Sequence, residues 1–447
     1  MPSIKIQDRD LTTVAVGGIL DNVVYIPGML GSKGEPTLSG KPELFLTLSE
    51  FKNKIGKEPN DLSYIMAEEL LIQGLPVLYE AFADKETLIA SLAAQPTTQP
   101  TTDASAPFSQ TAFERLEDRA EYPVKYITVG GYEDCMVKSD VEDDDDSINI
   151  IRNMIACAKE RGDAIALIDH AKFAKTLTAS QKISNIRTDL IPYLTGTKAS
   201  MTSAKLSYAS AFAPYGRYTL STARKIGDAG EYTNERWLPA SFGYLLALAK
   251  SIRNNPNWFA IAGINRGIVP KLVDVDVEIS RSVSEAYLQS NAALSINPII
   301  AYRNNADKYY TIWGNRTLAL NETDLATTAA DTHFQKPATD APNNTRASSY
   351  LNVRQLVCDL KKVLYAAASE LTFEQNSDVL WVNFKSKILP TLDFMVSNQG
   401  IRDYKIQKVR TNIRGALHAK ITIVPIEAVE DWIIDIELTD ADLTVND

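Results

Sequence analysis

The chain has 447 residues, of which 45% are hydrophobic and 23% are charged, and its formal net charge is −10. This length is enough for two or three domains with cores of their own, and the composition is that of an ordinary globular protein. The acidic balance argues against a protein that coats nucleic acid, because such a protein needs a basic surface.

The cysteines and the apolar runs indicate where the protein is made. Cys135, Cys157 and Cys358 are far apart and form no CxxC pair, so they predict neither a disulfide framework nor a zinc site. The N-terminus is charged and has no apolar signal core, and the most apolar run, residues 242–249, is too short to span a bilayer. We therefore expect a protein made in a cytoplasm, without membrane insertion.

In chain order, the first predicted elements are strands and one short helix. Residues 4–26 read as strands, the last of which is expected to stop at Pro27 and Gly28. A helix is predicted at 47–56. Residues 93–112 are rich in Pro, Thr and Gln and carry few bulky apolar side chains, so they predict a surface loop or linker.

Polar breaks divide the middle of the chain. The acidic residues 141–147 and the polar residues 327–349 are both expected to be loops. Between them, residues 163–169 form an apolar run that predicts a buried strand. Strands and helices are therefore mixed along the chain, which predicts a mixed α/β, or α+β, fold with more than one domain.

The last hundred residues have the clearest pattern. Apolar residues recur with a period near 3.6 over 353–371, which predicts an amphipathic helix. A second helix is predicted over 377–398, with Ser377 as its N-cap. Alternation of apolar and polar residues then predicts strands at 417–424 and 431–439.

Three stretches carry residues that could serve chemistry, and each has a plainer interpretation. Residues 28–35, GMLGSKGE, approach a phosphate-binding loop but are one residue short, with Gly34 in place of Ser or Thr. Residues 263–267, GINRG, lack the spacing of a dinucleotide-binding loop, so a structural turn is favoured. The run Asp143–Asp146 lacks alternating ligands, so a solvated acidic loop is favoured over a cation site.

The remaining chemistry-bearing residues form no motif. His170, His333 and His418 are scattered, and no zinc-protease or serine-hydrolase motif is present. An enzyme with a dispersed site, metal-dependent through the acidic run, stays open as an alternative. The residues alone therefore predict no catalytic residue, cofactor or metal.

Both ends of the chain carry alternating β segments without an evident partner in the sequence. A terminal strand can close the sheet of its own chain. It can also add to the sheet of another copy by β-augmentation. The residues alone leave both possibilities open.

Several segments, in the same order, resemble the contractile tail sheath family of bacteriophages and related injection particles. The most specific is 296–319, which combines Ile-Asn-Pro-Ile with a later Trp-Gly-x-Arg-Thr-Leu. Residues 257–269, NWFAIAGINRGIV, are similar to a Trp-x-x-Pro-Ala-Gly-x-x-x-Gly signature, from which Ala260 and Ile261 depart. Residues 350–356, YLNVRQL, are similar to Val-Asn-Val-Arg-Arg-Leu, with Gln at the second Arg. Further segments that resemble the family are 22–56, 161–169, 207–218, 236–252 and 373–401.

The resemblance implies a domain plan. It places an N-terminal arm at 1–20, an outer α/β domain at 21–330 and an inner C-terminal domain, with a C-terminal linker strand, at 331–447. Residues 93–160 match nothing in the family and look like a variable insertion, which we expect to decorate the surface. The resemblance also implies a structural protein, not an enzyme, without cofactors.

The implied function is that of a tail sheath subunit. Such a subunit polymerises helically around the tail tube and contracts to drive the tube through the target cell envelope, as in genome ejection. The implied partners are other copies of the chain in stacked hexameric rings, the tail tube protein, and baseplate and tail terminator proteins, with no direct contact to nucleic acid. The implied location is the virion tail, after assembly in the host bacterial cytoplasm. Another virion structural or baseplate component is the alternative.

The terminal arms are implied to exchange strands with neighbouring inner domains. The residues expected to carry this exchange are Ile4, Ile6, Val14 and Val16 in the N-terminal arm and Trp432, Ile434, Ile436 and Leu438 in the C-terminal arm. Alternation would let one face pack while backbone hydrogen bonds carry the pairing. On the helix at 353–371, Arg354, Lys361 and Lys362 are candidates for contact with the tube, and Arg354 has the alternative of binding within the subunit.

Overall fold

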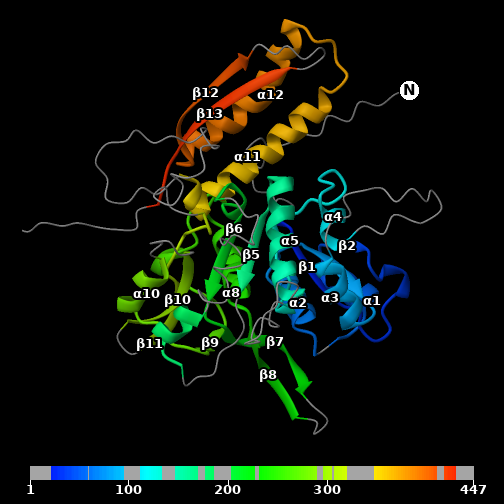
Figure 1. Ribbon diagram of the computed structural model, residues 1–447, viewed down its shortest axis with the longest axis vertical. Coiled ribbons are helices and arrows are strands. Elements are labelled where there is room, and N and C mark those ends of the chain that lie inside the picture. Colours follow the sequence, from blue (N-terminus) through cyan, green and yellow to red (C-terminus); the bar gives the residue numbers. More distant parts are fainter. Residues whose placement is uncertain are drawn as a thin grey trace, which may run out of the picture.

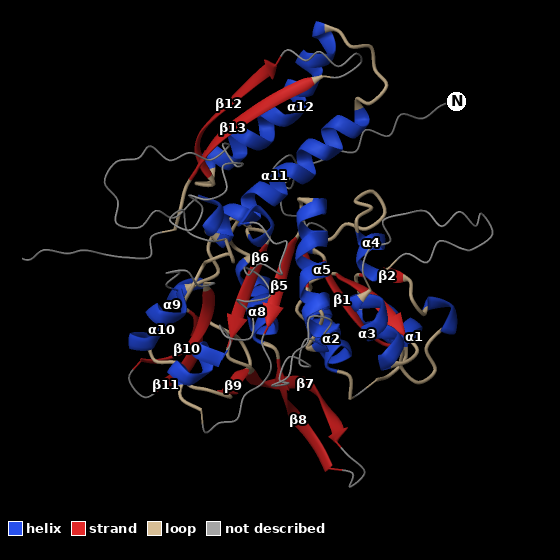
Figure 2. Ribbon diagram, viewed as in Figure 1, coloured by secondary structure: helices blue, strands red, loops and turns tan. Residues whose placement is uncertain are grey.

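The computed structural model describes residues 22–58, 60–94, 111–132, 146–169, 177–185, 203–226, 231–288, 295–304, 307–319, 347–409 and 417–428. Helices and strands are mixed throughout these ranges, as the sequence predicts (Figures 1 and 2). Two units can be distinguished. The α/β unit is built around one large sheet, and the C-terminal unit, of two helices and two strands, lies at the top of Figure 1.

The large sheet has eight strands in the order β11-β10-β6-β5-β4-β1-β3-β2. The strands from β10 to β3 in this order run parallel, and the edge strands β11 and β2 pair antiparallel with their neighbours. Their bounds are β1 Val24–Met29, β2 Pro42–Phe45, β3 Val77–Phe82, β4 Tyr126–Ile127, β5 Ile165–Asp169, β6 Ala209–Ala213, β10 Ile296–Asn304 and β11 Asp307–Ile312. Because helices cover both faces, β3, β5 and β6 are buried along their whole length.

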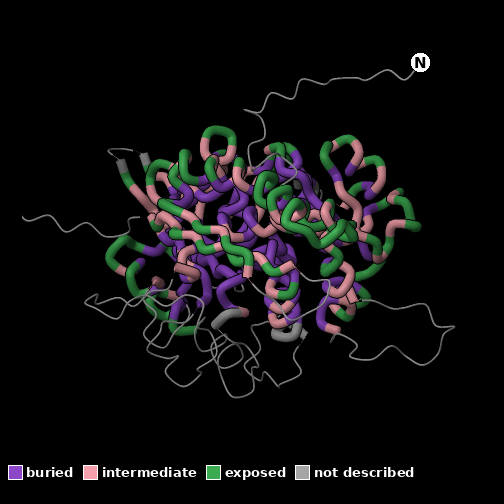
Figure 3. The backbone as a smooth tube through the Cα atoms, turned by 90° about the horizontal axis from the view of Figure 1, so that it is seen from above, coloured by how far each residue is buried: buried purple, intermediate pink, exposed green. Residues whose placement is uncertain are grey.

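Helices pack on both faces of the large sheet. Their bounds are α1 Leu48–Ile55, α2 Leu62–Ile72, α3 Lys85–Ala93, α4 Ala112–Leu116, α5 Asp146–Arg161, α7 Ser203–Leu206, α8 Ala240–Ser251, α9 Gly263–Arg266 and α10 Arg281–Leu288. α2 contacts α8, whereas α3 and α4 contact α5. The chain reverses its direction across the sheet after β3, so right-handed crossovers place α2 and α3 on opposite faces, and the contacts put α8 with α2 and α5 with α3. In Figure 3, which views the molecule from above, buried residues run through its centre.

A second sheet of three strands, in the order β8-β7-β9, lies at the lower end of the α/β unit in Figure 1. Its strands are β7 Gly216–Ile226, β8 Glu231–Leu238 and β9 Leu272–Val275. In the part of the chain that the structure describes, β9 pairs with the first residues of β7. The distal part of the β7–β8 hairpin therefore projects beyond the rest of the sheet.

The C-terminal unit consists of α11 Leu351–Glu370, α12 Asp378–Ser397, β12 Ile401–Val409 and β13 His418–Pro425. Side chains from the first half of α11, such as Leu351 and Cys358, belong to the core of the α/β unit. Side chains from its second half pack against α12 and the two strands. α11 is thus shared by both units, and this sharing holds them together.

The strongest predictions from the sequence are confirmed. The helices expected at 47–56, 353–371 and 377–398 are α1, α11 and α12, and the strands expected at 163–169 and 417–424 are β5 and β13. None of the helices in the described ranges is long and apolar enough to cross a membrane. The domain boundary expected between 330 and 331 lies outside the described residues, so the domain limits stay a prediction.

Two expectations need correction. β1 does not stop at Pro27 and Gly28 but continues to Met29. Within β1, the residues paired with β4 are Val24 and Tyr25. Pro27 therefore lies beyond the part of β1 that is paired with strands on both sides, and its missing N–H is tolerated there.

The second correction concerns the surface decoration expected over 93–160. β4 lies within this range, and it occupies the centre of the large sheet between β1 and β5. α5 contributes Ile150 and Ile155 to the main core, where both are fully buried. The described part of this range therefore belongs to the core, although the sequence there matched no segment of the family.

Candidate intersubunit surfaces

The carboxyl end of β1 is where an α/β enzyme would bind a ligand, because the order of the sheet reverses there. In this protein Asp61, the N-cap of α2, lies at that place. Its carboxylate accepts hydrogen bonds from the Met29 N–H and the Tyr132 hydroxyl, each at 2.8 Å. Burial, together with this carboxylate, raises the pKa of Tyr132.

Side chains of the protein itself fill the same crevice. A Cβ on Gly28 would lie 2.1 Å from the Tyr79 hydroxyl oxygen, and a Cβ on Gly130 would lie 2.0 Å from the Ser63 hydroxyl oxygen. The Asp169 carboxylate, at the end of β5, accepts a hydrogen bond from the Ser241 N–H at 2.7 Å. These polar groups connect strands to helices. The crevice at the carboxyl end of β1 therefore has a structural role in this protein.

The loop at residues 28–35 is a turn whose N–H groups already have acceptors. Gly31 and Ser32 donate to the backbone carbonyls of Ile55 and Lys57, at 2.9 and 3.1 Å. The Gly34 N–H donates to the Gly31 carbonyl at 3.0 Å. A phosphate-binding loop needs such groups free to point at the ligand, so this geometry favours the turn.

The segment GINRG forms the single-turn helix α9 and closes against β11. Gly263 has φ +73°, and a Cβ on Gly267 would lie 2.7 Å from the backbone of Ala262. The Gly263 carbonyl accepts a hydrogen bond from the Thr311 hydroxyl at 2.7 Å, and the Gly267 carbonyl accepts one from the Ile312 N–H at 2.8 Å. Both glycines thus serve a tight turn, as the sequence predicts.

The residues considered for a metal site are divided by the described ranges. Asp143–Asp145, His170 and His333 lie outside them, and His418 is exposed on β13. Within the described ranges, no group of three or more His, Cys, Asp or Glu side chains could hold a metal ion.

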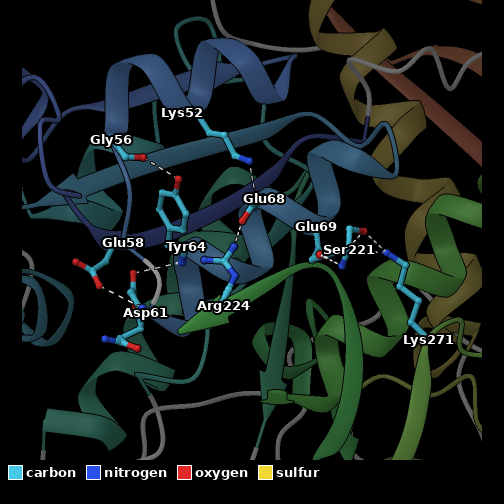
Figure 4. Close-up of polar contacts among 11 residues, drawn as sticks. Lys52, Gly56, Glu58, Asp61, Tyr64, Glu68, Glu69, Ser221, Arg224 and Lys271 are labelled. Carbon is cyan, nitrogen blue, oxygen red and sulfur yellow. Dashed lines mark hydrogen bonds and ion pairs between the residues drawn. The ribbon is translucent and has the colours of Figure 1, made fainter. Parts of the chain in front are cut away.

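Buried carboxylates on α2 anchor the β7–β8 hairpin (Figure 4). The Glu69 carboxylate accepts hydrogen bonds from the Ser221 N–H and hydroxyl at 2.6 and 2.9 Å, and it pairs with the Lys271 ammonium at 2.8 Å. Its neighbour Glu68 pairs with Lys52, at 2.6 Å, and with Arg224 of β7.

Both glutamates are at most 2% exposed, and burial lowers the pKa of Arg224. Removing one partner from such a set would leave a buried charge uncompensated. The hairpin is therefore fixed to the α/β unit and forms a firm projection.

The three segments that most resemble the sheath family meet where α11 leaves the α/β unit. The Asn315 side chain donates to the Asn352 side chain at 2.7 Å, and Asn352 donates to the Trp258 carbonyl at 3.3 Å. The Trp258 indole in turn donates to the Asn398 carbonyl at the end of α12, at 3.0 Å. These segments thus form a joint between the two units.

Arg354 takes part in this joint and is 7% exposed. Its guanidinium donates to the Ser207 hydroxyl at 2.6 Å and lies over the ring of Tyr208, 4.1 Å from the centroid. The alternative considered for Arg354, a contact within the subunit, is therefore what the structure contains. Lys361, about two helical turns further on, donates to the Tyr208 hydroxyl at 2.5 Å and is only partly buried, as is Lys362.

The joint also contains buried polar side chains whose partners lie far away in the sequence. The Lys125 ammonium lies 2.5 Å from the Asp359 carboxylate, with both side chains almost fully buried. Gln355 donates to the hydroxyls of Tyr126 and Tyr244, and this residue stands where the family signature has its second Arg. Charged residues on a helix are usually expected to face solvent. Only the structure therefore identifies these buried contacts.

The sheet of β12 and β13 is the most open surface of the C-terminal unit. It has two antiparallel strands, and in the described ranges no further strand pairs with either outer edge. One face, which carries Ile406, Ile421 and Ile423, packs on the helices. The other face is exposed. A two-stranded sheet with free edges is marginal by itself and is a template for added strands.

Three exposed apolar side chains lie at the turn between α11 and α12 and at the start of α12, and none of them was predicted from the sequence. Phe373 is fully exposed and has φ +71°, an uncommon conformation for a bulky residue. Val379 and Val382 on the first turns of α12 are 67% and 62% exposed. In the sequence, the only sign of this exposure was the position of Val379 and Val382, which lie three residues apart on the helix. Exposed apolar groups of this kind mark contact surfaces.

The residues expected to exchange strands cannot be placed. Residues 1–21 and 429–447, which include Ile4, Ile6, Val14, Val16, Trp432, Ile434, Ile436 and Leu438, lie outside the described ranges. Their role stays a prediction, and the open β12–β13 sheet is the described surface that it concerns.

The chain is similar to known proteins in part of its sequence and in its fold. No protein-family model matches the chain. Over 182 residues, which are 41% of the chain, it is 24% identical to the tail sheath protein of Vibrio phage KVP40, and the matched segment spans 23% of that protein.

Solved structures match over almost the whole chain. The helical sheath of the anti-feeding prophage in its contracted state has a TM-score of 0.57 at 12% identity, with 98% of each chain covered. The baseplate of the same particle has a TM-score of 0.58 at 12% identity, with 98% of this chain and 99% of that chain covered. The sheath complex of an extracellular contractile injection system, PVC, in its contracted state has a TM-score of 0.57 at 13% identity, with 98% of each chain covered. At such identities these matches establish a shared fold.

Proposed function

We propose, because the chain shares the fold of contractile tail sheath proteins and a stretch of sequence with one of them, that it is a tail sheath subunit. The subunit polymerises helically around a tail tube and contracts to drive the tube through the envelope of a target cell. It acts as a structural protein, without catalytic residues or a cofactor.

The observation that carries this proposal is the open β12–β13 sheet. Its inner face is complete, since Ile406, Ile421 and Ile423 pack on the helices, but its edges offer unpaired backbone groups in the described ranges. The expected strands in both terminal arms have the alternation that a strand added to such an edge needs. Exchange of arms between copies makes a heterologous contact that does not close on itself, which generates a helical array.

Contraction requires subunits that move as rigid bodies. The joint at the start of α11, with the buried pair of Lys125 and Asp359, couples the α/β unit to the C-terminal unit. The arms keep neighbouring copies connected while the bodies rearrange from a metastable to a more stable packing. Lys361 and Lys362 remain candidates for contact with the tube, because they lie on the part of α11 that is not fully buried.

The partners follow from this role. They are other copies of the chain in stacked hexameric rings, the tail tube protein, and baseplate and tail terminator proteins. The location is the tail of a phage or phage-like particle, after assembly in the cytoplasm of the host bacterium.

Negative-stain electron microscopy of the purified chain tests the proposal. We expect long hollow striated tubes at neutral pH, and we expect these tubes to be lost when residues 1–18 or 430–447 are deleted. A matched control replaces the exposed Glu86 of α3 by Gln, which leaves both arms intact. Uniform monomers at high concentration, with and without the tail tube protein, would contradict the proposal.

The similarity to a baseplate structure supports a second candidate, a baseplate component. Such a protein would form rings of fixed size and would not extend into tubes on addition of tube protein. The same microscopy separates the two candidates.

A further inference from the structure

The start of β1, where the N-terminal segment enters the described fold, is held by a buried amide pair. Asn22 lies just before β1, and its side-chain N–H donates a hydrogen bond to the side-chain oxygen of Asn257 at 3.2 Å. Both residues are at most 2% exposed. The pair therefore fixes the N-terminal end of β1 to the segment between α8 and α9, far away in the sequence.

The end of β13, where the C-terminal segment leaves the described fold, is held through the next residue, Trp258. The Ile426 N–H, just after β13, donates to the Gly400 carbonyl at 3.0 Å. A Cβ on Gly400 would lie 3.0 Å from the Trp258 indole nitrogen, so only glycine permits this close approach. The same indole N–H donates to the Asn398 carbonyl at 3.0 Å. The two consecutive residues Asn257 and Trp258, which we name the clamp, thus reach both ends of the described fold.

The clamp is itself fixed by the joint between the two units. Trp258 is 3% exposed, and its carbonyl accepts a hydrogen bond from the Asn352 side chain of α11 at 3.3 Å. Its ring meets the ring of Phe394 on α12 edge-on, with centroids 5.8 Å apart. Because close-packed groups have little room to shift, a displacement of the clamp would be passed on to both ends.

The amide pair of the clamp contributes to position more than to stability. In the part of the chain that the structure describes, the buried Asn22 Oδ1 and Asn257 Nδ2 atoms have no hydrogen-bond partner. A buried hydrogen bond between neutral groups gains about as much free energy as one buried polar group loses when it has no partner. The pair therefore adds little net stability, but its one hydrogen bond permits a single arrangement of the two chain segments.

We propose that the clamp fixes the exit positions of the two terminal segments relative to each other, and that Asn257 and Trp258 are positioning residues for assembly. The consequence for assembly rests on the proposed function, in which each terminal segment joins a different neighbouring copy. The clamp then sets where the two neighbours stand. A loosened clamp leaves the fold and both terminal segments in place but makes the spacing of copies irregular. The exit positions are a property of the single chain, so they can be measured without assembly.

Pulsed electron paramagnetic resonance on the full chain measures the relative exit position. In a background with Cys135→Ser, spin labels are attached at Asp21→Cys and Glu427→Cys, one beside each end of the described fold. Cys157 and Cys358 are buried and stay unlabelled. We expect one narrow distribution of distances between the two labels.

Variants of the clamp should widen this distribution. Asn257→Ala removes the amide pair and Trp258→Phe removes the indole N–H, so each should widen the distribution by about twofold or more, since each breaks one of the two connections. Asn153→Ala is the matched control. It removes two hydrogen bonds of a buried asparagine on α5, away from both ends, and should leave the distribution unchanged. Unchanged distances in both clamp variants, or equal widening in the control, would overturn the inference.

Electron microscopy gives the second readout. Tubes formed by the clamp variants with the tail tube protein should vary in diameter, whereas those of the unchanged chain and of the Asn153 control should be uniform. Widened label distances together with uniform tubes would overturn the role of the clamp in assembly. Absence of tubes from the unchanged chain would instead remove the proposed function, and the label distances would still decide whether the clamp fixes the exit positions.

Discussion

Lys125 and Asp359 form an ion pair that is almost completely shielded from water, where the α/β unit meets α11. Burying two charges costs several kcal/mol for each ion, and only close pairing and further hydrogen bonds offset that cost. Such a pair contributes little net stability compared with apolar residues. It fixes one arrangement of the two units, because any displacement would separate the charges.

Substitution of one partner should therefore be costly. Lys125→Met leaves the Asp359 carboxylate buried without its cation, and we expect a loss of about 3–5 kcal/mol in the free energy of unfolding, measured by urea denaturation. The double variant with Asp359→Leu should recover most of this loss. Lys387→Met, which removes an exposed pair with Glu370, should cost less than about 1 kcal/mol. A single-variant cost as small as that of the exposed pair would contradict this interpretation.

The buried thiols predict how stability depends on pH. Burial raises the pKa of Cys358 to about 11, whereas a thiol in the unfolded chain titrates near about 8.5. Because the folded pKa is the higher one, the contribution to stability is complete below about pH 8.5 and is lost as the pH rises toward 11. Each such thiol adds a slope of about 1.4 kcal/mol per pH unit in this window.

Cys358→Ala should flatten that slope by about 1.4 kcal/mol per pH unit between pH 9 and 10, and tyrosines, which titrate near about pH 10 in the unfolded chain, contribute equally in both proteins. Urea denaturation at a series of pH values measures it. Cys157→Ala should act in the same way, since burial raises the pKa of this thiol to about 12. An unchanged slope in both variants would show that the thiols are accessible in the folded protein.

Helices with a capping residue and strands with regular alternation were predictable from the sequence. The side chains of Thr47 and Ser377 accept hydrogen bonds from the first turns of α1 and α12, and these caps mark where the helices begin. Alternation identified β13. β4 was not predictable, because Tyr126 and Ile127 are too few to show a period and their strand character comes from the neighbouring strands.

The surfaces were predictable only in part. The sequence located β13 but not β12, and it could not show that their sheet has free edges, since pairing depends on distant segments. The burial of Glu68 and Glu69 on α2 depends on the position of the β7–β8 hairpin, so the sequence could not show it. For Arg354 it left two possibilities, and only the position of Tyr208 favours one of them.

The turn at α9 gives a prediction at the scale of an element. Gly267→Ala places a methyl group against the backbone of Ala262, which cannot move away easily, so we expect a loss of about 2–3 kcal/mol. Gly263→Ala meets no atom within 4 Å and suffers only from its positive φ, which costs about 1–2 kcal/mol. Thermal unfolding of both variants measures the difference. The reverse order of stability would contradict a turn set by close packing at Gly267.

At the scale of the whole molecule, the fold combines a firmly coupled body with one incomplete sheet. The joint at α11 and the anchored β7–β8 hairpin resist internal movement, because both depend on buried charged side chains. The β12–β13 sheet has free edges in the described ranges. Movement and assembly are therefore expected between copies and not within one copy, which is the behaviour that a contracting sheath requires.

The most direct test of the sheath function is a helical reconstruction by electron cryo-microscopy of tubes assembled from the full chain. We expect β12 and β13 to lie in a four-stranded sheet, completed by the N-terminal arm of one neighbour and the C-terminal arm of another. We also expect the α/β and C-terminal units to keep the relative position that they have in the single chain. Tubes in which both arms pair within their own chain, or in which β12 and β13 gain no strand, would contradict it.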